Sequence, residues 1–253
     1  MRVFITGASS GLGRALALEY SRLGATLGLV ARRTIGLSTL SASQSQHHRA
    51  YSLDVRDANA VRDAAADFIS TGGAPDIVIA NAGISTGTTL SHAEDLHVLQ
   101  DVIDVNVIGL ANTLQPFVDV MRAARAGSLV GIASVAAYRG LPGAGAYSAS
   151  KAAAVALLES LRVELHGSGV SVTTICPGYI ETPMTAANPY RMPFILRADD
   201  AARRIIRAIG KQKRHAVIPW QMALVAKALR VLPDPLYDAI FSRAPRKPRS
   251  GSR

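Results

Sequence analysis

The sequence predicts an α/β fold, a doubly wound parallel sheet of about seven strands with helices on both faces. Short apolar runs rich in β-branched residues alternate with longer segments that suit helices, and this alternation is typical of that fold. The binding crevice of such a sheet lies at the carboxyl ends of its strands. The expected strands cover residues 2–6, 26–31, 49–53, 76–80, 128–133, 170–175 and 215–218. The expected helices cover residues 11–23, 57–71, 93–123, 147–166, 199–211 and 221–231, with a weaker candidate at 34–46.

Length and composition agree with one large core. The chain has 253 residues, of which 49% are hydrophobic and only 5% aromatic, and this suits close packing of helices on a parallel sheet. We therefore expect a single domain over residues 1–253. The lone Cys176 cannot form an internal disulfide and is expected to lie buried in a strand. His47 and His48 are expected in a polar surface loop, and no metal site is expected.

The N-terminal residues MRVFITGASS already form a predicted strand and turn, so they leave no room for a signal peptide. No apolar run approaches the ~20 residues needed to span a bilayer. We expect a cytoplasmic protein.

Charge is concentrated near the C-terminus. Residues 1–195 hold 14 basic and 14 acidic residues, so the net charge of +10 arises from the 14 basic and 4 acidic residues of 196–253. A basic extension at about 211–244 precedes a tail at 245–253 that we expect to be disordered. Trp220 and Met222 among these bases suit the surface of an anionic membrane, or a helix that packs on a loop or a second subunit. No recognition motif accompanies the charge, which argues against nucleic acid as a partner.

A glycine-rich turn follows the first strand and opens the first helix. Gly7 permits the tight turn, Gly11 lets the backbone approach a pyrophosphate, and Gly13 allows close packing of helix and strand. The amides of the helix N-terminus favour an anion. Ser9, Ser10 and Leu12 complete this candidate cofactor-binding turn.

Tyr147 and Lys151 lie four residues apart in AYSASKAA, so one helix would present both on the same face. A free phenol titrates near ~10, and a neighbouring ammonium favours the phenolate. We therefore expect Lys151 to lower the pKa of Tyr147 and to make it usable as an acid or base.

Together with further motifs, these residues resemble the short-chain dehydrogenase/reductase family in order and spacing over about residues 1–185. This resemblance implies a Rossmann-type fold. One departure is Ala80, where the family often has a second asparagine before the Asn-Ala-Gly motif. The matching residues are the glycine turn, Asn81-Ala82-Gly83, Asn106, Ser134, Tyr147, Lys151 and Pro177-Gly178.

The resemblance implies a catalytic set of Asn106, Ser134, Tyr147 and Lys151. In the family the serine binds the substrate oxygen, the tyrosine transfers the proton, and the lysine holds the nicotinamide ribose and tunes the tyrosine. The asparagine supports a water that relays protons. Taken alone, Asn106 could equally be a buried helix residue bonded to backbone.

The second strand ends in Val30-Ala31-Arg32-Arg33, without the acidic residue that binds the ribose hydroxyls of NAD. A guanidinium at Arg32 or Arg33 suits the 2′-phosphate of NADP, so we predict that NADP(H) is preferred over NAD(H). The family match also assigns Asp54 and Val55 to the adenine, although Asp54 could instead cap a helix. It assigns Pro177, Gly178, Ile180 and Thr182 to the nicotinamide.

The loop at about 182–198 is the expected substrate lid. Its apolar residues suit a lipophilic carbonyl or alcohol, or else they pack only on the protein itself. The family resemblance implies a homodimer or homotetramer. The predicted function is an NADP-dependent oxidoreductase. Two alternatives are a non-catalytic NADP-binding sensor or scaffold, and a nucleotide-sugar epimerase or dehydratase, which usually has a longer substrate domain.

Overall fold

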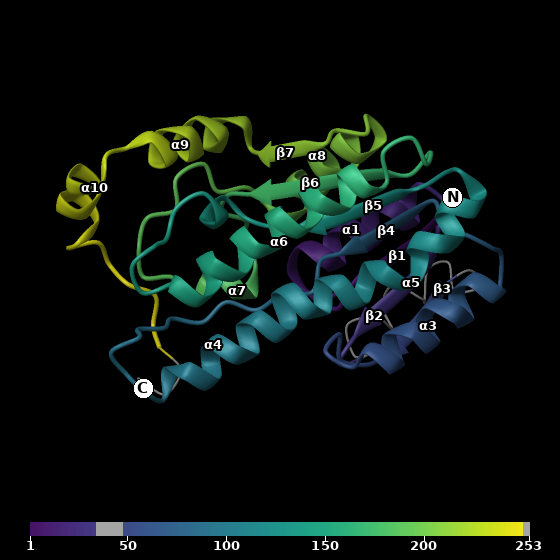
Figure 1. Ribbon diagram of the computed structural model, residues 1–253, viewed down its shortest axis with the longest axis horizontal. Helices are drawn as coiled ribbons and strands as arrows, with labels where there is room; N and C mark the ends of the chain where they lie inside the picture. Colours follow the sequence, from purple (N-terminus) through teal and green to yellow (C-terminus); the bar gives the residue numbers. More distant parts are fainter. Residues whose placement is uncertain (34–47, 250–253) are drawn as a thin grey trace.

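A computed structural model describes residues 1–33 and 48–249 of the chain. Seven strands form one parallel sheet in the order β3-β2-β1-β4-β5-β6-β7 (Figure 1). The strands are β1 (Arg2–Thr6), β2 (Thr26–Ala31), β3 (His48–Ser52), β4 (Ile77–Ala80), β5 (Ser128–Ile132), β6 (Ser171–Pro177) and β7 (His215–Ile218). The predicted fold class is confirmed, and the strand order reverses direction between β1 and β4, where the crevice of such a sheet lies.

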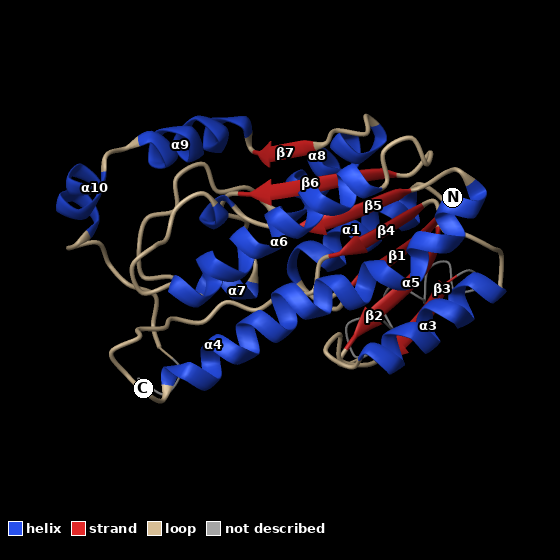
Figure 2. Cartoon of the chain, in the orientation of Figure 1, coloured by secondary structure: helices blue, strands red, loops and turns tan. Residues whose placement is uncertain are grey.

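Helices cover both faces of the sheet (Figure 2). One face carries α1 and α8, and the other carries α3, α5 and α6. The helices are α1 (Gly11–Arg22), α3 (Ala58–Ser70), α4 (Asp95–Ile103), a π-helical turn (Asp104–Ile108), α5 (Gly109–Ala124), a 3₁₀ turn (Val135–Ala137), α6 (Gly145–Glu164), α7 (Pro183–Ala186), α8 (Ala198–Gly210), α9 (Trp220–Val231) and α10 (Asp234–Phe241).

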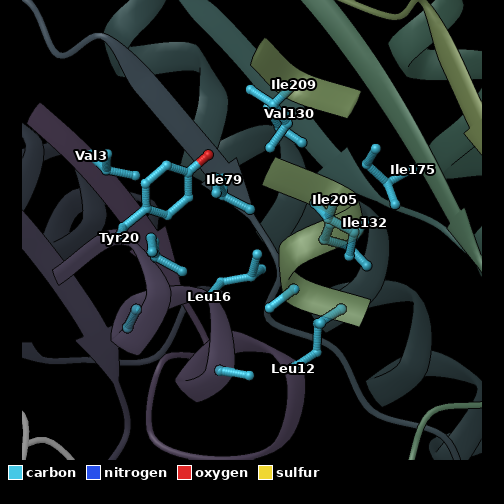
Figure 3. Packing of buried hydrophobic residues seen from close by; sticks show 14 of the residues in the cluster. Val3, Leu12, Leu16, Tyr20, Ile79, Val130, Ile132, Ile175, Ile205 and Ile209 are labelled. Carbon is cyan, nitrogen blue, oxygen red and sulfur yellow. The ribbon is translucent and has the colours of Figure 1, made fainter. Parts of the chain in front are cut away.

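The core between α1, α8 and the sheet is made mainly of aliphatic side chains, with the ring of Tyr20 among them (Figure 3). Leu16 of α1 and Ile205 of α8 are fully buried, and they contact strand residues such as Ile79. Apolar residues three and four apart give each helix one inward face, as the sequence pattern predicts. This packing fixes α1 on the sheet and therefore fixes the turn that precedes it.

The core on the other face is aromatic at its centre. The ring of Phe4 lies 5.6 Å from that of Phe68 and 4.9 Å from that of Phe117, measured between centroids. Gly28 makes room for this cluster, because a Cβ there would lie 2.6 Å from Phe4. Cys176 is fully buried in β6, as predicted.

Some local predictions need correction. His48 begins β3 and its Nε2 lies 3.1 Å from Oγ of Ser21, so it is not a loop residue. Asp57, rather than Asp54, caps α3 by accepting hydrogen bonds from Asn59 and Ala60. The predicted helix at 34–46 and His47 lie outside the described residues.

The C-terminal part differs most from expectation. Helix α10 was not predicted. Residues 245–249, which belong to the tail expected to be disordered, cross to the loop between β4 and α4, where Pro248 accepts a hydrogen bond from the backbone N of Gly87 at 3.1 Å. Residues 250–253 lie outside the described residues.

Candidate active site

The turn between β1 and α1 brings three backbone segments into close contact. Gly7 and Gly11 have φ angles of 70° and 52°, which glycine adopts without steric cost. A Cβ on Gly13 would lie 2.2 Å from the carbonyl oxygen of Gly7 and 2.4 Å from Nδ2 of Asn81. Asn81 Nδ2 donates to the carbonyl oxygen of Thr6 at 3.0 Å, so the end of β4 supports the turn.

The loop after β6 forms the opposite wall. A Cβ on Gly11 would lie 3.1 Å from Cγ2 of Thr182. The backbone N of Thr182 donates to Oγ1 of Thr185 at 3.1 Å, and Thr185 Oγ1 donates to the carbonyl oxygen of Ile180 at 2.5 Å. The glycine turn and this loop therefore face each other across one cleft.

One end of the cleft is basic. Arg32 and Arg33 follow β2, are exposed, and line the cleft together with Asp54. Asp54 accepts hydrogen bonds from Nη2 and the backbone N of Arg56 at 2.8 and 3.0 Å. These bonds, chiefly the one from the Arg56 side chain, hold the pKa of the Asp54 carboxyl below its usual value. Asp54 thus stays anionic, while Arg32 and Arg33 are available to bind a phosphate.

The other end holds the predicted catalytic side chains. Tyr147 lies in the first turn of α6, and Ser134 follows β5. Lys151 is only 4% exposed, and its Nζ donates to the carbonyl oxygen of Ile132 at 2.7 Å. The same Nζ lies 5.8 Å from the ring centroid of Tyr147. Helix α6 and the end of β5 therefore bring these three groups together, as the spacing predicts.

Burial governs the protonation of these groups. Desolvation raises the pKa of the Tyr147 phenol, and a hydrogen bond with Ser134 opposes only part of that effect. Desolvation also lowers the pKa of Lys151 to about 8. The expectation that Lys151 lowers the pKa of Tyr147 is not supported, because burial outweighs the effect of an ammonium at this distance. At neutral pH the phenol keeps its proton.

Asn106 lies behind the cleft and is 1% exposed. It sits in the π-helical turn between α4 and α5, a distortion frequently found at functional sites. Its Oδ1 accepts from the backbone N of Ile84 at 2.8 Å, and its Nδ2 donates to the carbonyl oxygen of Ile84 at 3.0 Å and to Oγ of Ser150 at 2.9 Å. A Cβ on Gly83 would lie 3.2 Å from Asn106 Oδ1 and 3.6 Å from Lys151 Nζ. Asn106 thus joins the loop after β4 to α6 beside the lysine.

Apart from Asn106, all of the predicted site residues line this one cleft. They are Gly7, Ser9, Ser10, Gly11, Leu12, Gly13, Arg32, Arg33, Asp54, Val55, Asn81, Ala82, Gly83, Ser134, Tyr147, Lys151, Pro177, Gly178, Ile180 and Thr182.

Several other lining residues were not predicted as site residues, among them Leu53, Ile84 and Val105. Ile84 directly follows the Asn-Ala-Gly motif, so its position was a usable signal. The ring of Tyr190 in the expected lid lies 6.3 Å from that of Tyr179, measured between centroids, and the pKa of its phenol is raised mainly by burial.

The cleft fits an extended dinucleotide. Its glycine turn has no room for the added Cβ of Gly13 and so presents bare backbone, and Arg32 lies at the far end from Tyr147 on the carboxyl edge of the sheet. Within residues 1–33 and 48–249, no group of three or more His, Cys, Asp or Glu side chains is placed to hold a metal ion. In the same ranges, no helix has the length and apolar character needed to cross a membrane.

Comparisons with known proteins agree with this geometry. A family model described as short chain dehydrogenase matches residues 1–192. An uncharacterised oxidoreductase of Myxococcus xanthus is 39% identical over 245 residues, which cover 94% of this chain and 95% of that protein.

Two similar solved structures contain a nicotinamide dinucleotide or a derivative of one. An alcohol dehydrogenase from Thermococcus sibiricus, complexed with 5-hydroxy-NADP, is 26% identical with a TM-score of 0.75 and covers 86% of this chain and 95% of its own. A short chain dehydrogenase from Mycobacterium paratuberculosis, bound to NAD, is 25% identical with a TM-score of 0.75 and covers 85% and 94%. A nicotinamide dinucleotide is therefore the supported cofactor class, and the chain belongs to the short-chain dehydrogenase family of oxidoreductases.

Proposed function

We propose that the protein is an NADP-dependent oxidoreductase that interconverts a carbonyl and an alcohol, with Tyr147 as the general acid and base. The observation that carries this proposal is the convergence of Tyr147, Ser134 and Lys151 at one end of a cleft whose other end is a glycine turn beside Arg32. A bound nicotinamide would supply or accept the hydride. The residues of this chain position the substrate and move the proton.

In the reducing direction, Tyr147 donates its phenolic proton to the carbonyl oxygen as negative charge develops there. The phenol holds the proton that this step requires, because burial keeps its pKa above the ordinary value. Ser134 Oγ can donate a hydrogen bond to the same oxygen, which stabilises charge where it forms. Lys151, between the backbone of Ile132 and Gly83, would hold the cofactor ribose.

The preference for NADP over NAD is supported by Arg32. Arg32 directly follows Ala31, which stands where an acidic residue would bind the ribose hydroxyls of NAD. A guanidinium there suits a charge-assisted hydrogen bond to a 2′-phosphate. We expect Arg32→Ala to lower kcat/KM with NADPH by about tenfold or more and to leave kcat/KM with NADH nearly unchanged. Arg62→Ala, at an exposed position of α3, is the control. An equal or higher efficiency of the parent protein with NADH would refute the preference.

The substrate is proposed to be lipophilic. Met184 lines the cleft, and Phe194 and Ile195 of the predicted lid are 50% and 37% exposed, so the lid offers apolar surface to a substrate.

The test is a panel of ketones, aldehydes, steroids and acyl ketones, assayed with NADPH for the parent protein and for Tyr147→Phe. We expect Tyr147→Phe to lower kcat by about 10²- to 10⁴-fold while NADPH binding persists. Tyr20→Phe is the matched control, because among the described residues the buried Tyr20 hydroxyl has no hydrogen-bond partner. Activity that survives Tyr147→Phe would contradict the mechanism. NADPH binding without turnover of any compound would favour the sensor or scaffold.

Two further features of the chain are also proposals. Members of this family are commonly oligomeric, and the exposed Leu157 and Val163 of α6 support a homodimer or homotetramer. Peripheral contact with an anionic membrane is favoured only by α9, where Trp220 and Leu224 are 65% and 60% exposed. Sedimentation with anionic vesicles tests it, and no binding at low salt would end the hypothesis.

A further inference from the structure

The segment after α10 runs to the loop between β4 and α4, and we call residues 246–249 the C-terminal strap. In Figure 1 the yellow end of the chain runs from α10 to the start of α4. A Cβ on Gly87 would lie 2.3 Å from the carbonyl oxygen of Lys247, and one on Gly143 would lie 2.7 Å from Cβ of Arg246. Thr88 N donates to the carbonyl oxygen of Gly143 at 3.0 Å, so the strap rests on two loops that are joined to each other.

Arg249 anchors the strap. Its Nε and Nη2 donate to the two carboxylate oxygens of Asp95 at 2.9 and 3.0 Å, and Nη2 also reaches Glu94 at 3.0 Å. Asp95 is only 3% exposed and accepts a further hydrogen bond from the backbone N of Thr89 at 2.7 Å. A bidentate contact to a buried carboxylate is among the stronger polar contacts in proteins, so Lys247 lies in a held segment.

Lys247 spans the two walls of the cleft. Its Nζ donates to Oγ of Ser85 at 2.9 Å and to the carbonyl oxygen of Met184 at 3.5 Å. Met184 lines the cleft from α7, and Ile84, the neighbour of Ser85, lines it from the loop after β4. Ser85 is two residues from Gly83, which adjoins Lys151, and two residues span at most about 7 Å. The ammonium therefore lies within a small-molecule length of the catalytic end.

The charge of Lys247 lacks a counterion among the described residues. No carboxylate in residues 1–33 and 48–249 comes within 4.0 Å of its Nζ, while the nearby acids Glu94 and Asp95 contact Arg249. Its side chain is half-buried, and burial lowers the pKa of its amine. A partly desolvated cation gains more from a bound anion than a fully hydrated one does.

We propose that Lys247 is a specificity-determining residue, which selects substrates that carry an anionic group beyond the reacting carbonyl or alcohol. The anionic group is a carboxylate, sulfate or phosphate at one end of an otherwise apolar molecule. This inference rests on the proposed function, because it names the substrate class of the same cleft. The apolar lid and the ammonium of Lys247 together suit an amphiphilic anion.

The test compares keto acids of increasing chain length with their methyl esters, using NADPH and the full chain. For Lys247→Met, we expect the ratio of kcat/KM for acid over ester to fall by about 10- to 100-fold through KM, with kcat for the acid little changed. Lys247→Arg should retain most of the ratio. Lys213→Met, at an exposed position outside the strap, should not change it.

Three outcomes would overturn the proposal. The ratio could stay constant in Lys247→Met, which would make the lysine a tether of the strap. The dissociation constant of NADPH could rise as much as the KM of the acid, which would assign the cation to the cofactor. Esters could be preferred by the parent protein at every chain length. Failure of the proposed function would give a different result from failure of the Lys247 proposal. In that case the parent would reduce neither acids nor esters, or the Tyr147→Phe variant would reduce both as fast as the parent does.

Discussion

The glycine turn and the C-terminal strap each depend on a glycine that has no room for a side chain. They differ in which atoms an added Cβ would clash with. At Gly13 the obstacle is the backbone of Gly7, six residues away and fixed by β1. At Gly87 it is the backbone of Lys247 and Pro248, which come about 160 residues later and belong to no helix or strand. The first contact is built into the core, whereas the second can be released by moving one segment.

This difference shows that sequence motifs predict local structure but not contacts between distant segments. The turn is a local device, so its glycine spacing is readable without a structure. The strap pairs with loops from two other parts of the chain, and nothing in APRKPRSGSR indicates that pairing. The composition of residues 245–253 predicted disorder, but Arg249 forms hydrogen bonds with the buried Asp95.

The largest effect should come from Gly13→Ala. Its new Cβ would meet backbone that cannot move without displacing β1, so we expect the free energy of unfolding to fall by about 1–3 kcal/mol and NADPH affinity to drop. Urea denaturation and NADPH fluorescence measure these quantities. Gly210→Ala is the control, because a Cβ there meets nothing within 4 Å and the helix should be unaffected or slightly stabilised. A loss of stability in both variants would show that the close contact is not the cause.

An effect of comparable size should be the pH dependence caused by the buried Lys151. Its folded-state pKa of about 8 lies below the ordinary 10.5, so below pH 8 both states are protonated and the cost of burying the charge is fully present. Between pH 8 and 10.5 the folded protein releases the proton while the unfolded chain keeps it. The free energy of unfolding contributed by this group should therefore rise, by up to about 3 kcal/mol.

The measurement is urea denaturation of the parent and Lys151→Met across that pH range. Stability of the parent relative to the variant should increase with pH. Ionisations that do not interact with Lys151 cancel in this difference. Cys176 is not one of them, because the charge of Lys151 lowers the pKa that burial raises at that thiol. Curves that stay parallel from pH 8 to 10.5 would contradict the role of burial. Lys247→Met should show a smaller trend, because Lys247 is only half-buried.

The smallest effect on stability should come from Gly87→Ala. The strap can lift away from the new Cβ, so we expect a change in unfolding free energy below about 1 kcal/mol and unchanged NADPH affinity. Trypsin should cleave after Arg243 and Arg246 faster than in the parent, as mass spectrometry would show. If Gly87→Ala instead unfolds the protein like Gly13→Ala, the strap is part of the core and the distinction between the two regions fails.

The sequence by itself determined the order of strands and helices, the glycine turn and the spacing of Ser134, Tyr147 and Lys151. Helices and strands have characteristic periods of apolar residues, and the turn and the helical spacing depend on neighbouring residues. Local sequence is therefore enough to predict all of these features. It also indicated Arg32 as the residue that faces the far end of the cofactor cleft, since that position follows directly from the end of β2.

Only the tertiary structure decided the protonation of Tyr147, the burial of Asn106 outside the cleft lining and the course of the strap. A pKa depends on how far packing removes a group from water, and that packing comes from segments remote in sequence. Lys247 meets Ser85 and Met184 for the same reason. Contacts between distant segments arise when the sheet and its two cores bring them together, and no local pattern records them.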